Sequence, residues 1–185
     1  MGDLGGFQGI ERLGRPGSAS PSGGRSLWRA LPSPPDVSTR LPHIDAPALE
    51  VEAEPHLVWA ALLDRLPRSP RGAGAVAELL GCTDRRRSGD PAEPGSTWVG
   101  FRVVAAEPAS RLALAGEHRF SRYTLTFTID DLGAGRSRLR AATDAAFPGV
   151  AGGAYRGLVI RSGIHARVTR SMLESIRDRA ERPEP

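Results

Sequence analysis

The side chains best suited to chemistry lie on the C-terminal stretch and at the end of one predicted strand. His165 could act as an acid or a base, because the pKa of a free imidazole is about 6.5. Tyr155 could offer a hydroxyl group, and Arg119 could bind a carboxylate or an enolate. His165, Tyr155 and Arg119 are therefore the candidate catalytic residues. Each also has a structural interpretation, as a helix-flank histidine, a core aromatic or a solvated strand end, so the sequence leaves open whether the protein is an enzyme.

A second group of residues has the mixture of bulk and polarity typical of a pocket wall. Ser162 and Thr169 fall on the apolar stripe of a predicted helix, where polar side chains either bond back to the helix or line a cavity. Thr143 and its neighbours Arg140 and Asp144 could face them, although a one-residue shift in strand register would invert that set. The predicted ligand-binding residues are Trp98, Phe101, His118, Tyr123, Phe127, Tyr155, Val159, Ser162, His165 and Thr169.

Several familiar kinds of site have no matching pattern in the sequence. The four histidines are far apart and Cys82 is the sole cysteine, so we expect neither a metal site nor a disulfide within the chain. The glycines at 149–157 are not followed by the Lys-Ser/Thr pair of a phosphate-binding loop, and no Gly-x-Ser-x-Gly motif occurs. We therefore predict no cofactor, and we interpret Cys82 as a small buried hydrophobic residue.

The charge pattern argues against a nucleic-acid partner. The net charge is +4, and every basic residue is arginine, interleaved with Asp and Glu rather than gathered on one face. Arg85-Arg86-Arg87 is the only basic run, and we interpret it as a solvated edge. No apolar run approaches the roughly 18–20 residues that span a bilayer. Together with the single cysteine, this predicts a cytoplasmic protein without a membrane span.

The composition changes near residue 42. Residues 1–42 are rich in Gly, Pro, Ser and Arg, which predicts a disordered tail that cannot bury enough apolar surface to fold. That tail could recruit a partner, or part of it could lie upstream of the true translation start. Residues 43–182 have the patterning of one domain.

In that domain, helices are predicted from Pro55 to the residue before Pro67, over 73–80 with Gly81 as its C-cap, and as one continuous helix over 150–181. The predicted strands cover residues 44–53, 83–88, 97–106, 111–118, 122–130 and 137–147. Consecutive strands with short turns indicate an antiparallel meander whose apolar face needs a cover. The sequence thus predicts an α+β fold, with a curved sheet of about six strands, two short helices after the first strand, and the long C-terminal helix covering the sheet.

Four motifs, in this order, resemble the START-like or SRPBCC superfamily, which includes polyketide cyclase/dehydrase-like proteins. They are Glu-Pro-His-Leu-Val-Trp at 54–59, Glu-Pro-Gly-Ser-Thr-Trp at 93–98, Val-Ala-Ala-Glu-Pro-Ala-Ser-Arg-Leu at 104–112, and Phe-Pro-Gly-Val-Ala-Gly-Gly-Ala-Tyr at 147–155. The last, with His165 and the Ser-Met-Leu of 171–173, resembles an uncharacterised branch sometimes fused to NAD-binding, epimerase-like domains. The resemblance covers about residues 44–181 and implies a helix-grip fold with a cavity between sheet and helix.

The resemblance implies a ligand-binding role. We expect a small hydrophobic or amphipathic molecule to bind in the cavity, and a monomer or homodimer that binds no nucleic acid. The alternative is a cyclase, dehydratase or isomerase that acts on a polyketide-like or other apolar substrate by acid–base chemistry in the same cavity.

Overall fold

The computed structural model describes residues 41–66 and 73–182 of the 185-residue chain. The predicted disordered tail, residues 1–42, lies outside the described residues except for its last two positions. Within the described ranges, seven strands, four α-helices and one π-helical segment form an α+β fold. The predicted fold class is confirmed.

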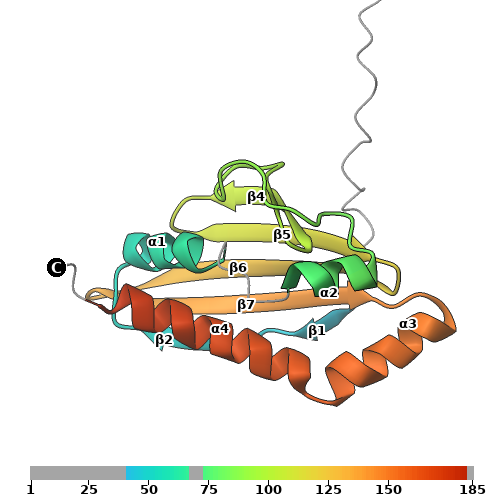
Figure 1. Ribbon diagram of the computed structural model, residues 1–185. Helices are drawn as coiled ribbons and strands as arrows, with labels where there is room; N and C mark the ends of the chain where they lie inside the picture. Colours follow the sequence, from blue (N-terminus) through green and yellow to red (C-terminus); the bar gives the residue numbers. More distant parts are fainter. Residues whose placement is uncertain (1–40, 67–72, 183–185) are drawn as a thin grey trace, which may run out of the picture. The chain divides into compact units, whose positions relative to one another are not determined.

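The strands form one curved antiparallel sheet (Figure 1) in the order β1-β7-β6-β5-β4-β3, with β2 also pairing with β7. From β3 onward each strand pairs with the next in the chain, which is the expected meander. The bounds are β1 His43–Asp45, β2 Ala48–Val51, β3 Thr97–Trp98, β4 Phe101–Glu107, β5 Arg111–His118, β6 Ser121–Gly133 and β7 Arg136–Ala146.

Three predicted strands are corrected by the structure. Residues 83–88 form no strand and contribute only an isolated bridge from Ser88 to Thr97. The predicted strand over 97–106 is divided, because Gly100 takes a φ of 84° between β3 and β4. The first predicted strand, 44–53, is interrupted near Pro47, which cannot donate a backbone hydrogen bond.

The two short helices lie where they were predicted. Helix α1, Pro55–Arg65, starts with proline in its first turn, where the missing N–H costs nothing. Helix α2, Ala73–Leu80, is followed by Gly81 with a φ of 70°, as expected for a glycine C-cap. Helix α1 packs beside the last helix, where Arg65 Nε donates a hydrogen bond to Ser175 Oγ at 3.1 Å.

The C-terminal stretch is not one continuous helix, which corrects the prediction for 150–181. It consists of α3, Gly149–Arg156, a π-helical segment η1, Gly157–Arg161, and α4, Ile164–Ala180. Gly163 has a φ of 73°, a left-handed conformation that glycine adopts without steric cost. The chain bends there, so α3 and α4 meet at an angle (Figure 1). An apolar stripe of helical period persists through this break, which is why the pattern did not reveal it.

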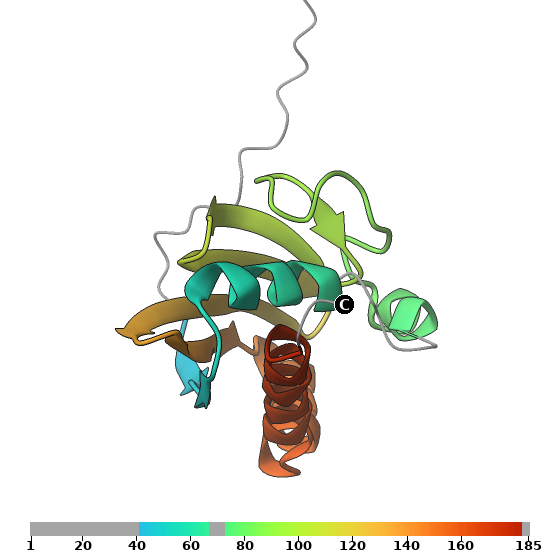
Figure 2. The ribbon, with the colours of Figure 1, turned by 90° about the vertical axis from the view of Figure 1, so that its left-hand side faces the viewer.

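The core lies where α1 and α4 cover one end of the sheet (Figure 2). The side chains that are almost completely buried there include Val58, Leu62, Leu112, Phe127, Leu139, Leu173 and Ile176. Ser137 is the polar exception, and its hydroxyl donates a hydrogen bond to the Ala53 carbonyl at 2.7 Å. A buried hydroxyl satisfied in this way joins β7 to the start of α1 without an unpaired polar group.

Candidate functional site

The inner face of the sheet changes character along its strands. At the α1 end it carries the large apolar side chains of Leu112, Leu114, Phe127, Ile129 and Leu139. Toward the other end, the same strands carry Gly116, His118, Ser121, Tyr123, Thr143 and Ala145. Small and polar residues there leave space that the large apolar residues fill elsewhere.

That space is a pocket of about 520 Å³ which opens to solvent. Its walls come from the sheet, from α2, from the end of α3, from η1 and from the first turn of α4. Most of the lining is apolar, with a few hydroxyl and imidazole groups among aromatic and aliphatic side chains. This combination is typical of sites for small organic molecules.

The structure brings together six of the ten predicted ligand-binding residues at this pocket. They are Phe101, His118, Tyr123, Tyr155, Val159 and His165. Trp98 and Phe127 instead pack into the core, and Thr169 is buried on α4 away from the pocket. Ser162 is exposed and its hydroxyl donates to the Leu158 carbonyl, so it takes the back-bonding alternative. The bend at Gly163 follows Ser162 directly, so residues before and after it no longer belong to one straight helix, although their spacing in the sequence is unchanged.

The three candidate catalytic residues separate in the same way. Tyr155 and His165 line the pocket. Arg119 is exposed in a neighbouring groove, where its guanidinium donates to the Leu79 carbonyl and lies 5.1 Å from the centre of the Phe120 ring. Arg119 therefore ties the β5–β6 turn to α2, outside the pocket lining.

His118 is a defined hydrogen-bond donor in the pocket wall. Its Nδ1 accepts a hydrogen bond from the Phe120 N–H at 3.2 Å, so the neutral ring carries its proton on Nε2. Burial lowers the pKa of His118, because the charged form is poorly solvated there. The ring meets Tyr155 edge to face, with ring centres 5.0 Å apart.

Tyr123 is held in place by close backbone contacts. Its hydroxyl donates to the Gly100 carbonyl at 2.7 Å, and burial raises its pKa. Gly116 makes this position possible, since a Cβ there would lie 2.2 Å from the Gly100 oxygen and 2.4 Å from the Tyr123 ring. Burial also raises the pKa values of Tyr155 and Cys82, so all three groups stay protonated near neutral pH.

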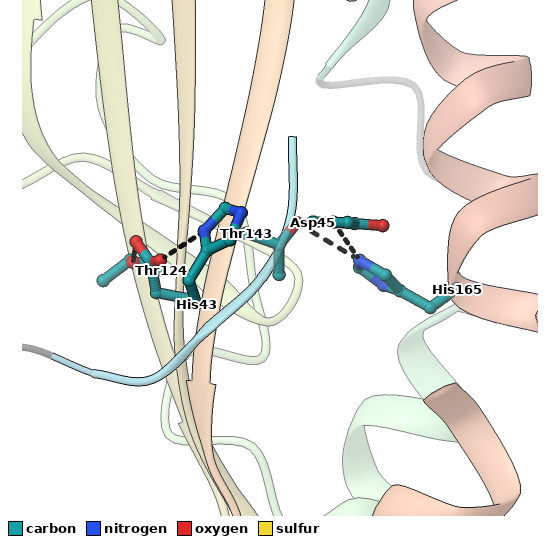
Figure 3. A network of polar contacts seen from close by, with 6 residues as sticks. His43, Asp45, Thr124, Thr143 and His165 are labelled. Atoms are coloured by element: carbon teal, nitrogen blue, oxygen red, sulfur yellow. Dashed lines mark hydrogen bonds and ion pairs between the residues drawn. The ribbon is translucent and has the colours of Figure 1, made fainter. Parts of the chain in front are cut away.

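A polar network joins His165 to the edge of the sheet. Figure 3 shows His165 extending from α4 toward Asp45 of β1 and Thr143 of β7. The Nε2 atom lies 3.3 Å from Asp45 Oδ1 and 3.2 Å from Thr143 Oγ1. A carboxylate only accepts hydrogen bonds, so in the neutral ring the Asp45 contact assigns the proton to Nε2 and leaves a lone pair on Nδ1. An imidazole oriented by a carboxylate is the usual arrangement of a general base.

A second histidine network is formed by Asp144, the residue after Thr143 on β7. Asp144 Oδ1 lies 3.0 Å from His43 Nδ1, and Asp144 Oδ2 accepts a hydrogen bond from Thr124 at 3.4 Å. Successive residues of a strand point to opposite faces, so Thr143 and Asp144 serve different sides of the sheet. A register shift between His43 and Asp45 lets β1 supply one partner to each.

Sequence reasoning missed Asp45 and the pocket positions of Cys82, Ser121 and Ala145. No local signal identifies Asp45 as a partner of His165, because the two are 120 residues apart in the chain. Thr143 was open to inference, since it continues the inward alternation of Leu139 and Ala141. Among residues 41–66 and 73–182, no group of three metal-ligating side chains gathers, and no helix is long and apolar enough to cross a membrane.

The sequence matches no protein-family model, and no curated protein matches it significantly. Solved structures share its chain path. Truncated norcoclaurine synthase from Thalictrum flavum is 12% identical with a TM-score of 0.50, covering 78% of this chain and 99% of that one. The Zhui aromatase/cyclase from Streptomyces sp. R1128 is 19% identical with a TM-score of 0.49, covering 77% of this chain and 94% of that one. A START superfamily protein from Mycobacterium smegmatis is 14% identical with a TM-score of 0.47, covering 75% of this chain and 97% of that one.

Proposed function

We propose that this chain, which has the START-like, helix-grip fold, binds a small hydrophobic or amphipathic molecule between its sheet and the helices α2, η1 and α4. The observation that carries the proposal is the change of the inner sheet face from large apolar to small and polar residues. Close packing is the rule in protein interiors, so a space of about 520 Å³ beside a filled core is a specific feature.

The lining favours one chemistry of ligand. Phe101, Tyr123 and Tyr155 offer aromatic surfaces, while the His118 Nε2–H is a donor for a ligand carbonyl or hydroxyl oxygen. A largely apolar molecule with one or two oxygen functions satisfies both. We further propose that residues 43–182 act as a single domain in the cytoplasm, as a monomer or homodimer.

The test is a binding screen of the full chain against apolar metabolites of increasing oxygen content, read by thermal shift and by native mass spectrometry. Ala145→Phe fills the pocket and should abolish binding of any ligand found. Ala142→Phe makes the same change of volume three residues away, on the outer face of β7, and should leave binding intact. Equal binding by both variants, or no binding by the parent protein across the screen, contradicts the proposal.

The His165 network supports a second candidate function, acid–base catalysis on the bound molecule. With the proton on Nε2 held by Asp45 and Thr143, Nδ1 is the nitrogen that would take a proton from a substrate. A cyclase, dehydratase or isomerase step on a carbon acid next to a carbonyl needs such a base. Tyr155 is the proton donor available in the same pocket, and its raised pKa keeps it protonated.

Exchange of carbon-bound hydrogen separates catalysis from binding. A carbonyl ligand found in the screen is incubated with the protein in D₂O and followed by proton NMR. Enzymic deprotonation incorporates deuterium at the adjacent carbon, and His165→Gln should stop this incorporation while retaining the thermal shift. Ligand binding without exchange leaves the protein a binding module, whereas exchange unchanged in His165→Gln excludes His165 as the base.

A further inference from the structure

The helical elements that form the pocket also carry exposed apolar side chains, which we call the rim. They are Val76 (55% exposed) and Leu79 (72%) of α2, Leu158 (65%) of η1, and Ile164 (51%) and Val168 (62%) of α4. Val76 itself lines the pocket, and Leu79, Leu158 and Ile164 are each next in sequence to a lining residue.

The rim residues of α4 face the side on which α1 and α2 lie. Ile164 and Val168 are four residues apart and share one face of the helix. Ser175, seven residues beyond Val168 on the same face, accepts the hydrogen bond from Arg65 of α1. Figures 1 and 2 both show α1 and α2 on the same side of α4. The helix face that carries Ile164 and Val168 is therefore the face turned toward α1 and α2.

Three of the rim residues, Leu158, Ile164 and Val168, lie in the stretch of the domain whose charges are most strongly of one sign. Residues 145–173 contain Arg156, Arg161, Arg167 and Arg170 but no Asp or Glu. All four arginines are exposed, and within the described ranges only Arg170 has an ionic partner, Glu174 at 3.2 Å. Elsewhere arginines are commonly paired, as Arg122 is with Glu117 and Arg138 with Glu50.

Exposed aliphatic side chains beside unpaired arginines match the boundary between the headgroups and acyl chains of an anionic bilayer. The apolar side chains would gain nothing on a nucleic-acid backbone, where contacts are ionic. A symmetric homodimer through this surface would oppose the arginines of one copy to those of the other. The combination therefore selects an anionic lipid surface.

We infer that the rim and the arginines of residues 156–170 dock the protein on anionic phospholipid membranes with the pocket mouth toward the bilayer. Such docking places the opening where apolar molecules concentrate. It does not depend on which ligand the pocket takes, so it succeeds or fails separately from the proposed function.

The experiment is sedimentation of the full chain with vesicles of phosphatidylcholine alone and of phosphatidylcholine with phosphatidylserine. Binding to the anionic vesicles should decline with added salt, because screening weakens the arginine contribution. Arg161→Gln with Arg167→Gln should weaken it by roughly fivefold per arginine removed. Arg111→Gln with Arg136→Gln, at sites away from the rim, makes the same change in net charge and should have little effect. The arginine-containing N-terminal tail is present in every variant.

The apolar contribution is tested by Leu158→Ser with Ile164→Ser, against Leu57→Ser on α1 as control, with folding checked by circular dichroism. Loss of vesicle binding in the rim variant alone supports the inference. Equal binding to both vesicle types, equal losses in the two arginine pairs, or insensitivity to the rim variant overturns it. So does light scattering that shows a concentration-dependent dimer which the rim variant abolishes, since the rim is then a self-association surface.

Discussion

The two ends of the inner sheet face are built from the same strands but serve different purposes. At one end Phe127, Leu139 and Leu173 pack between the sheet, α1 and α4 with almost no exposed surface. At the other end His118, Tyr123 and Thr143 surround unfilled space. The residues at a few inward positions, rather than the path of the backbone, therefore decide whether this fold has a core or a pocket at a given point.

The helices that cover the sheet also differ between its two ends. The second half of α4 is regular, and Leu173 and Ile176 point inward from it. Residues 149–163 contain five glycines, two of them left-handed, and a π-helical segment, and they bury little. A cover of this kind stabilises the fold weakly and leaves the space beneath it open.

The largest expected difference comes from the same truncation at each end. Phe127→Ala should lower the free energy of unfolding by about 3–5 kcal/mol, because it empties a completely buried site in the core. Phe101→Ala, at the partly exposed pocket wall, should cost clearly less. Urea unfolding followed by circular dichroism measures both. Equal costs would mean that the pocket end is packed as tightly as the core.

An added methyl group tests how tightly the pocket wall itself is built. Gly116→Ala should destabilise the protein by about 1–3 kcal/mol, because the new Cβ overlaps the Gly100 carbonyl and the Tyr123 ring. Gly153→Ala in α3 is the matched control, since no atom lies within 4 Å of its Cβ, and alanine there favours the helix. Thermal unfolding of the two variants should move in opposite directions; a tolerated Gly116→Ala would show that Tyr123 is free to shift.

The bend in the cover is tested at Gly163. Gly163→Ala should cost about 1–2 kcal/mol, because a side chain is disfavoured at a φ of 73°. Gly163→Asn should cost less, since asparagine tolerates the left-handed region better than alanine does. Chemical unfolding ranks the three proteins. If alanine is as good as glycine, the bend is not imposed at this residue.

The smallest expected effect is a pH dependence that originates in the pocket wall. The pKa of His118 is lowered in the folded state, so below about pH 6.5 the unfolded state binds more protons. The stability that this histidine contributes is fully present above the pKa of the unfolded state. It is lost as the pH falls toward the lower pKa of the folded state. His118→Gln should therefore reduce the loss of stability between neutral and mildly acidic pH, measured by urea unfolding at each pH. An unchanged pH profile would mean that His118 is solvated.

Much of the fold was predictable because its signals are local. Helix α1, the strands β5, β6 and β7, and the glycine C-cap after α2 follow from periodicity and turn residues, and all were found within a few positions. Two errors have physical causes. Gly163 breaks the last helix without disturbing its apolar stripe, and Gly100 divides a strand whose alternation continues across it.

The candidate site was predictable only in part. Pocket residues such as Tyr123 and His165 were inferred from the chemistry of their side chains and from their positions on a predicted strand and a predicted helix. Trp98 and Phe127 share that chemistry but pack into the core, and strand alternation does not distinguish core positions from pocket positions. Asp45 could not be found, because its role depends on the pairing of β1 with β7.

The position of Asp45 on β1 has a kinetic consequence. This three-residue strand lies at the margin of the sheet and pairs with β7 alone. Short marginal strands open locally far more often than a whole domain unfolds. Each such fraying event withdraws the carboxylate from His165 while the core stays intact, so the imidazole alternates between an oriented and an unoriented state. Amide hydrogen exchange at residues 43–45 would give the frequency of that alternation.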